Sequence, residues 1–117
     1  MKREEDNIQR NLISHLEVRG VRGLMYWHTP LGGIRSKTEA AILKGLGTLS
    51  GLPDLFLLFR GKLFGLELKA NRGRVSKTQT ETLAQLEDAG CVTAVVHGID
   101  AAIEQLERWG LLRGKVQ

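Results

Sequence analysis

The sequence contains a single cysteine, Cys91, among its 117 residues. One cysteine excludes an intramolecular disulfide and a cysteine-based metal site, so we expect Cys91 to be a small buried residue. Long hydrophobic runs are also missing, because the longest falls far short of the ~20 apolar residues that a membrane helix needs. The first ten residues, MKREEDNIQR, are charged and lack the apolar core of a signal peptide. These absences favour a cytoplasmic protein.

Several catalytic signatures are absent as well. The three histidines have no sequence context that marks one of them as a base, so no serine or cysteine triad is indicated. Gly45, Gly47 and Gly51 superficially suggest a nucleotide-binding loop, but the Gly-Lys-Ser/Thr of a P-loop does not follow them. We interpret His28 as a strand residue at the edge of a sheet rather than as a ligand.

Composition is that of an ordinary globular chain. The length predicts one domain over residues 1–117, large enough for a sizeable core. Hydrophobic residues make up 42% and charged residues 26%, which is typical of globular proteins. The net charge of +4 favours an anionic partner.

The order of predicted elements indicates an α/β fold. Apolar spacing and capping patterns predict helices over residues 3–18, 36–46, 76–89 and 99–109, and strands over 24–28, the hairpin 54–69 and 91–96. This order is typical of a mixed four-stranded sheet flanked by helices. The continuously apolar run 91–96 is expected to be a strand buried on both faces.

Three charged residues stand out in the otherwise apolar hairpin. Alternate residues of a strand share a face, so Glu67 and Lys69 project together. If Arg60-Gly61 forms a two-residue turn, the register places Asp54 directly opposite Glu67. Side chains that are directly opposed in a sheet have Cβ atoms ~5 Å apart. The pattern therefore predicts two close carboxylates beside a lysine, at the end of the hairpin away from its turn.

Two explanations of these carboxylates remain open at this point. Asp54 after Pro53 fits an ordinary turn aspartate, with Glu67 and Lys69 on a solvated strand face. Alternatively, a divalent cation between Asp54 and Glu67 relieves their repulsion, since Mg²⁺ takes oxygen ligands and often only one or two protein carboxylates. Lys69 then lies where it can stabilise negative charge on a phosphate. The combination of all three favours a reaction centre.

The same residues carry a family resemblance. Pro53-Asp54 followed by Glu67-Leu68-Lys69 resembles the Pro-Asp…(Asp/Glu)-X-Lys signature of the superfamily that includes many restriction enzymes and junction resolvases. With the lead-in Gly51-Leu52 and the downstream run from Gly73 to Gln79, the chain is similar to the virus-type replication–repair nuclease family, VRR-NUC. The resemblance extends from about Glu5 to about Val96.

This resemblance implies a restriction-endonuclease-like fold and metal-dependent hydrolysis of phosphodiester bonds. Asp54 and Glu67 would hold Mg²⁺ or Mn²⁺, helped by the backbone carbonyl of Leu68. Lys69 would orient or help deprotonate the attacking water and stabilise charge on the phosphate. Stand-alone members of the family are similar to this chain in length, and the resemblance implies a homodimer that acts on branched DNA such as Holliday junctions.

Gln79 has two candidate roles. As the fourth residue of Ser76-Lys77-Thr78-Gln79, it matches a capping box, in which its side chain returns to the backbone of Ser76. It also shares the inward face of the predicted helix with Thr82 and Leu83, from which it can reach a metal-bound water or a phosphate. The two roles are compatible, and the resemblance places Gln79 among the catalytic residues.

Glu5 is a further candidate metal ligand. At ~100° per residue it falls within the apolar stripe of the first helix, formed with Ile8, Leu12 and Leu16. A carboxylate on such a stripe either belongs to the first turn of the helix, where the helix dipole favours it, or faces a cation. The first motif of the family, a glutamate shortly before a glutamine, is matched by Glu5 and Gln9, with Asp6 as the competing carboxylate.

Surface contacts are predicted with less support from the pattern. Five cationic residues are candidate phosphate contacts on DNA, namely Lys37, Lys44, Arg72, Arg74 and Lys77. Trp27, Trp109 and Leu111-Leu112 are expected to be exposed and are candidate dimer-interface residues. The main alternative to a nuclease is a DNA-binding module of the same fold that does not cut, and the third is a structural protein with a fortuitous motif.

Overall fold

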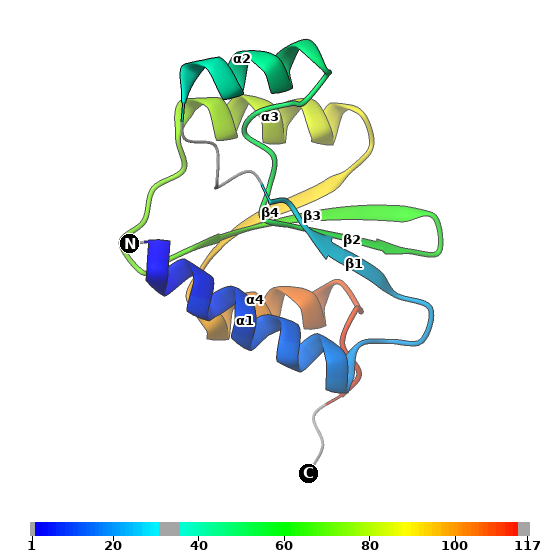
Figure 1. Cartoon of the computed structure of the whole chain (residues 1–117). Helices are drawn as coiled ribbons and strands as arrows, with labels where there is room; N and C mark the ends of the chain where they lie inside the picture. The colour runs from blue at the N-terminus through cyan, green and yellow to red at the C-terminus, as the bar shows by residue number, and fades with distance from the viewer. Residues whose placement is uncertain (1, 31–35, 115–117) are drawn as a thin grey trace.

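The structure is a computed structural model that describes residues 2–30 and 36–114. Its elements follow the predicted order, and Figure 1 shows them as one sheet between two layers of helices. They are α1 Lys2–Arg19, β1 Met25–His28, α2 Lys37–Gly45, β2 Leu55–Phe59, β3 Lys62–Lys69, α3 Lys77–Asp88, β4 Val92–His97 and α4 Ile99–Arg108. The mixed four-stranded α/β fold predicted from the sequence is confirmed.

The strands lie in the spatial order β1-β2-β3-β4. Strand β2 runs antiparallel to both β1 and β3, whereas β3 and β4 are parallel. Parallel neighbours need a crossover connection, and α3 provides it between β3 and β4. The hairpin β2–β3 therefore forms the centre of the sheet, and β1 and β4 are its edges.

The central hairpin has the predicted two-residue turn. Phe59 pairs with Lys62, so Arg60 and Gly61 are the only residues between the strands. Both have positive φ, 50° for Arg60 and 79° for Gly61, as the tight turns of hairpins require. The register runs to Leu55 opposite Leu66. If this register is continued by one residue, Asp54 lies opposite Glu67, as predicted.

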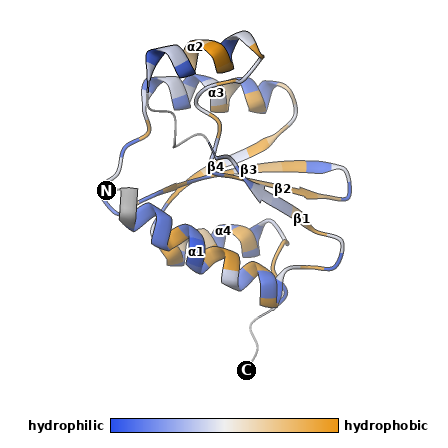
Figure 2. Ribbon diagram, viewed as in Figure 1, coloured by the Kyte–Doolittle hydropathy of each residue, from blue (hydrophilic) through white to orange (hydrophobic). Residues whose placement is uncertain are grey.

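One face of the sheet carries the main core. Helices α1 and α4 cover this face and α3 covers the other, with α2 outside α3 (Figure 1). Apolar residues of β2 and β3 are buried there together with side chains of α1 and α4: Leu55, Leu57, Leu66, Leu68, Leu12, Leu16, Ala102 and Leu106. Figure 2 shows the corresponding apolar colour along β2 and β3.

Two expectations about burial are wrong. Strand β4 lies at the edge of the sheet, so Val92 to Val95 are only half-buried and Val96 alone is buried in this strand. Leu111 and Leu112 are buried rather than exposed, because the chain after α4 returns to α1, where Leu112 forms a β-bridge with Gly20. Trp109 is half-buried and packs on Phe64 with ring centroids 4.9 Å apart.

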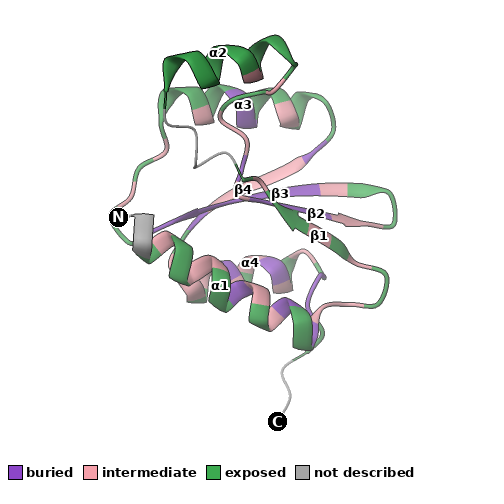
Figure 3. Ribbon diagram, viewed as in Figure 1, coloured by how far each residue is buried: buried purple, intermediate pink, exposed green. Residues whose placement is uncertain are grey.

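Helix α2 contributes nothing to the core. None of its residues is buried, and Ile42 is 59% exposed (Figure 3). The helix begins as predicted, because the Ser36 hydroxyl accepts a hydrogen bond from the N–H of Glu39. Within residues 2–30 and 36–114, no helix is long and apolar enough to cross a membrane.

Candidate active site

A cleft of about 540 Å³ opens at the end of the hairpin away from its turn. Five residues singled out in the sequence line it together: Glu5, Asp54, Glu67, Lys69 and Gln79. They come from the start of α1, the approach to β2, the end of β3 and the first turn of α3. The structure thus brings together residues that are as far apart as positions 5 and 79.

The approach to Asp54 is anchored on α3, which explains the Gly51-Leu52-Pro53-Asp54 sequence. Gly51 has a φ of +80°, and a Cβ atom there would lie 2.7 Å from the carbonyl oxygen of Thr78. Only glycine tolerates both this conformation and this close approach. One residue earlier, the carbonyl of Ser50 accepts a hydrogen bond from the Thr82 hydroxyl at 2.7 Å.

Asp54 is then held between two neighbouring strands. Its carbonyl oxygen accepts a hydrogen bond from the N–H of Thr29, just beyond β1, at 2.9 Å. Its carboxylate Oδ2 accepts another from the main-chain N–H of Leu68 on β3, at 2.8 Å. Pro53 is buried beside Gly65, whose missing side chain makes room for the proline ring. Main chain and side chain are therefore both fixed.

Glu67 and Lys69 share one face of β3, as the alternation of a strand predicts. Glu67 is 2% exposed and Lys69 is 8% exposed, so both charges are removed from water. Lys69 Nζ lies 3.1 Å from Glu67 Oε2. The interpretation of these residues as a solvated strand face is wrong, because an ion pair this buried is separated from solvent.

The pKa of each carboxylate, Glu67 and Asp54, is subject to effects that raise it and effects that lower it. The pKa of Glu67 is raised to about 7 in total: burial is the largest cause, the nearby Asp54 charge adds to it, and Lys69 and Gln79 oppose it. Burial also raises the pKa of Asp54. The hydrogen bond from the Leu68 N–H opposes this rise, and the charge of Glu5 adds to it. Four carboxylates, those of Glu5, Asp6, Asp54 and Glu67, thus line a cleft to which Lys69 contributes a buried positive charge.

Gln79 forms the predicted capping box and also contacts Glu67 in the cleft. Its Oε1 accepts from the N–H of Ser76 at 3.0 Å, and its own N–H donates to the Ser76 hydroxyl at 3.1 Å, which confirms the capping box. Its Nε2 donates to Glu67 Oε2 at 2.8 Å. The side chain therefore links the first turn of α3 to the carboxylate on β3.

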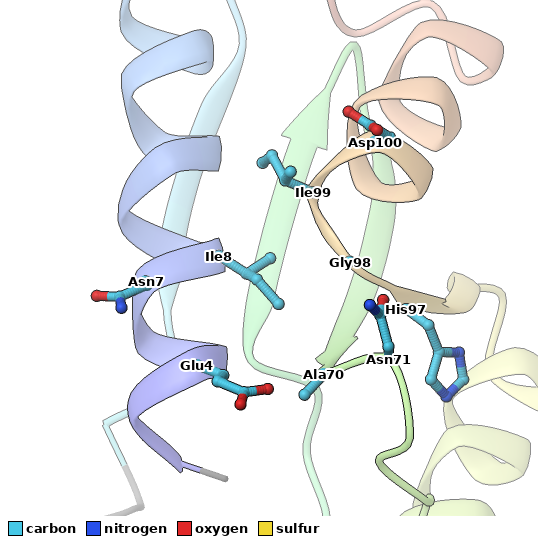
Figure 4. Close-up of a pocket in the computed structure, with 9 residues that line it drawn as sticks. All are labelled: Glu4, Asn7, Ile8, Ala70, Asn71, His97, Gly98, Ile99 and Asp100. Atoms are coloured by element: carbon cyan, nitrogen blue, oxygen red, sulfur yellow. The ribbon is translucent and has the colours of Figure 1, made fainter.

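Glu5 and Glu4 face different clefts. Glu5 is half-buried and lines the cleft of Asp54, and its charge acts on the Asp54 carboxylate. Glu4 is exposed and lines a separate cleft of about 490 Å³, between α1 and the start of α4 (Figure 4). Adjacent residues of an α-helix project about 100° apart, which is consistent with this arrangement. Asp6, the competing carboxylate, also lines the cleft of Asp54.

Sequence reasoning missed part of the cleft wall. His28 lies on the edge strand β1, as expected, but it also lines the cleft, together with Thr29 and Pro30 that follow it. Gln9 on α1, which the family resemblance had paired with Glu5, lines it as well. No local signal marks His28, because its place in the cleft depends on which elements meet at this end of the hairpin.

The five predicted DNA contacts lie outside this cleft, on exposed positions. Arg72 and Arg74 belong to the loop between β3 and α3, and Lys77 is the first residue of α3, so all three are close in sequence to Lys69 or Gln79. Lys37 and Lys44 lie at the two ends of α2.

The donor atoms in the cleft suit a hard divalent cation. Across the described part of the chain, no group of three or more His, Cys, Asp and Glu side chains is arranged to hold a metal ion. Mg²⁺ does not require such a group, because it commonly keeps several waters and binds one or two carboxylates. Asp54 and Glu67 fit that role, since a bound cation offsets the burial and mutual repulsion that raise the pKa of both.

The comparison with protein families decides the assignment. A model of the VRR-NUC domain matches residues 3–100. The chain belongs to the VRR-NUC domain family. This family is of the nuclease type, its members generally use a divalent metal, and DNA is the substrate that it implies. No curated protein matches the sequence.

Solved structures of other VRR-NUC domains share the fold. One, described as a "VRR_NUC domain protein", superimposes with a TM-score of 0.74 at 21% identity, over 94% of this chain and 91% of that chain. Another, described as a "VRR_NUC domain", has a TM-score of 0.60 at 19% identity, over 90% of this chain and 95% of that one. At these identities the likeness concerns the fold alone.

Proposed function

We propose that this VRR-NUC protein is a Mg²⁺- or Mn²⁺-dependent DNA endonuclease that acts on branched DNA such as Holliday junctions. The observation that carries the proposal is the convergence of Asp54, Glu67, Lys69 and Gln79 in one cleft, with direct contacts joining the last three. Burying two carboxylates side by side destabilises the fold, so their presence here favours a catalytic role.

Each residue has a defined task in this proposal. Asp54 and Glu67 hold the cation, with the carbonyl of Leu68 and with Glu5 as the further ligands. The cation, when bound, activates water and neutralises charge on the phosphate. Lys69, whose ammonium lies 3.1 Å from Glu67 Oε2, is a fixed positive charge for the negative charge that develops on the phosphate. Gln79 orients Glu67.

Substrate binding is assigned to the exposed cations. Lys37, Lys44, Arg72, Arg74 and Lys77 contact phosphates on either side of the scissile bond, and each such contact releases counterions. A homodimer with two-fold symmetry presents two clefts, which suits paired cuts across a junction. Of the residues expected at its interface, Trp27 is 39% exposed and remains available, whereas Leu111 and Leu112 are buried.

The deciding experiment is a cleavage assay with defined DNA substrates. Labelled junction, flap, duplex and single-stranded DNA are incubated with Mg²⁺, Mn²⁺, Ca²⁺ or EDTA. We expect cleavage with Mg²⁺ or Mn²⁺, preferentially of the junction, and none with EDTA. Asp54→Ala and Glu67→Ala should abolish it, and Lys69→Ala should bind DNA normally yet cut about 100-fold more slowly.

The assay also separates the alternatives. DNA binding by the wild type without cleavage under any cation would favour the non-cleaving DNA-binding module. Light scattering on the same samples tests the homodimer, and a monomer that cuts junctions at full rate would exclude it. Cleavage at wild-type rate by all three variants would remove the proposed active site.

A further inference from the structure

Helices α2 and α3 begin with almost the same four residues, Ser-Lys-Thr-Glu at positions 36–39 and Ser-Lys-Thr-Gln at 76–79. In both, the serine hydroxyl accepts a hydrogen bond from the N–H of the fourth residue, at 3.0 Å in α2 and 3.1 Å in α3. Glutamate and glutamine serve equally as the fourth residue of a capping box. Helix capping therefore leaves the difference between Glu39 and Gln79 unexplained.

The surroundings of Gln79 explain it. The amide contacts two groups of opposite character, the N–H of Ser76, which can only donate, and Glu67 Oε2, which accepts. One side-chain amide has an acceptor and a donor on the same planar group, so it satisfies both. A glutamate at this position would keep the bond to Ser76 but would set a second carboxylate against Glu67.

Both donors to Glu67 use the same oxygen. Gln79 Nε2 lies 2.8 Å and Lys69 Nζ 3.1 Å from Oε2, and neither uses Oε1. The Gln79 amide is itself clamped by the backbone at the start of α3, and the Lys69 side chain is buried. The orientation of the Glu67 carboxylate is thus imposed from two different elements, β3 and α3.

We infer that Gln79 is a positioning residue, which transmits the rigid first turn of α3 to the Glu67 carboxylate and fixes its orientation in the cleft. This inference rests on the proposed function, because it treats Glu67 as a metal ligand. It also gives the Ser76 capping box a role beyond the start of a helix. Hydrogen bonds that orient ligands in this way commonly change metal affinity or activity by about 10- to 100-fold when they are removed.

A reciprocal exchange tests the inference within one chain. Gln79→Glu keeps a residue suited to capping and removes the donor to Glu67, while Glu39→Gln makes the opposite exchange on α2 as the matched control. We expect Gln79→Glu to lower kcat about 10- to 100-fold at saturating Mg²⁺ with little change in KM for DNA. Its melting temperature in EDTA should also fall by several degrees. Glu39→Gln should leave kcat unchanged, and wild-type values for Gln79→Glu would overturn the inference.

Gln79→Met separates positioning from added charge. Methionine removes the donor without introducing a carboxylate, so kcat should fall here as well, and a normal kcat would show that only the charge mattered. An independent readout is the nuclear magnetic resonance signal of the Gln79 side-chain NH₂, which should shift in Glu67→Ala. An unchanged signal would contradict the contact. If the wild type cuts no DNA, the proposed function fails, while the melting and resonance measurements still test the link between Gln79 and Glu67.

Discussion

Asp54 accepts a hydrogen bond on its carboxylate Oδ2 from the main-chain N–H of Leu68, at 2.8 Å. The bond joins the residue just before β2 to β3, beyond the last strand pair Leu55–Leu66. Asp54 therefore has two separable functions. Its oxygen satisfies a buried main-chain donor, and its charge contributes to the repulsion with Glu67.

Asp54→Asn should separate these two functions. Asparagine keeps a carbonyl oxygen for the Leu68 N–H but carries no charge, whereas Asp54→Ala leaves that N–H without its partner. We expect both variants to lose cleavage, with the asparagine variant more stable than the alanine variant by about 1–2 kcal/mol. Urea unfolding in EDTA measures the difference. Equal stabilities would mean that the Leu68 bond contributes nothing to folding.

The stability of the metal-free protein should fall as the pH rises from about 4.5 to about 7. Burial raises the pKa of Glu67 from its ordinary 4.5 to about 7, so in this range the folded state holds a proton that the unfolded state has released. Stability decreases with pH wherever the folded state binds more protons. A pKa change of this size corresponds to a loss of about 3 kcal/mol, complete above pH 7.

Urea unfolding in EDTA at several pH values checks this dependence. Glu67→Gln has no proton to release at this position and should show a much smaller fall in stability over the same range. Glu81→Gln, which replaces an exposed carboxylate on α3, should follow the wild type. Above pH 7, added Mg²⁺ should restore the stability of the wild type, because a ligand that binds the folded state stabilises it. A flat wild-type profile would rule out the raised pKa.

Gly51→Ala should disturb both the fold and the position of Asp54. Gly51 and Gly47 both have positive φ, which costs a residue with a Cβ about 1–2 kcal/mol. At Gly51 the added Cβ also lies 2.7 Å from the Thr78 carbonyl, whereas nothing lies within 4 Å at Gly47. We therefore expect Gly51→Ala to be the less stable variant and, at a temperature where both are folded, the slower nuclease. Similar losses in both would reduce Gly51 to a turn residue.

Local rules predicted the part of the site that depends on the hairpin. The turn Arg60-Gly61 fixes the register, and the register together with strand alternation places Asp54, Glu67 and Lys69 without knowledge of other elements. The capping box of α3 is equally local. The sequence left two roles open for Gln79, because its contact with Glu67 depends on how α3 packs on the sheet.

The errors concern long-range packing. The run 91–96 is apolar enough for a central strand, but nothing within it shows that β4 has a neighbour on one side only. Leu111 and Leu112 follow a helix that ends at Arg108, and their burial arises from pairing with a residue some 90 positions earlier, Gly20. His28 lines the cleft for a similar reason, since the other walls come from α1, β3 and α3, which are distant from it in sequence or set by tertiary packing.

Arg72, Arg74 and Lys77 should determine how DNA affinity depends on salt. If each contacts a phosphate, replacing all three with glutamine lowers the slope of log K against log salt by up to about 0.9 per contact on duplex arms. Arg22→Gln is the control and should leave the slope unchanged, because Arg22 is exposed in the segment before β1, whose first residue Met25 pairs with Leu58 near the turn end of the hairpin. Fluorescence anisotropy between 50 and about 200 mM salt gives the slopes. An unchanged slope in the triple variant would place the DNA elsewhere.

Glu5 and Glu4 are a suitable variant and control for a test of the metal site, because they are adjacent on α1 and line different clefts. The charge of Glu5 raises the pKa of Asp54, and a third carboxylate beside Asp54 and Glu67 is best tolerated with a cation bound.

Glutamine keeps the shape and helix propensity of glutamate without its charge. Glu5→Gln should therefore raise the Mg²⁺ concentration needed for half-maximal cleavage by about 10-fold or more, with maximal rate less affected. Glu4→Gln should match the wild type in a Mg²⁺ titration of cleavage, and calorimetry of Mn²⁺ binding without DNA should rank the variants in the same order. The same Mg²⁺ requirement in both would make Glu5 a first-turn residue of α1 and leave the cation to Asp54 and Glu67.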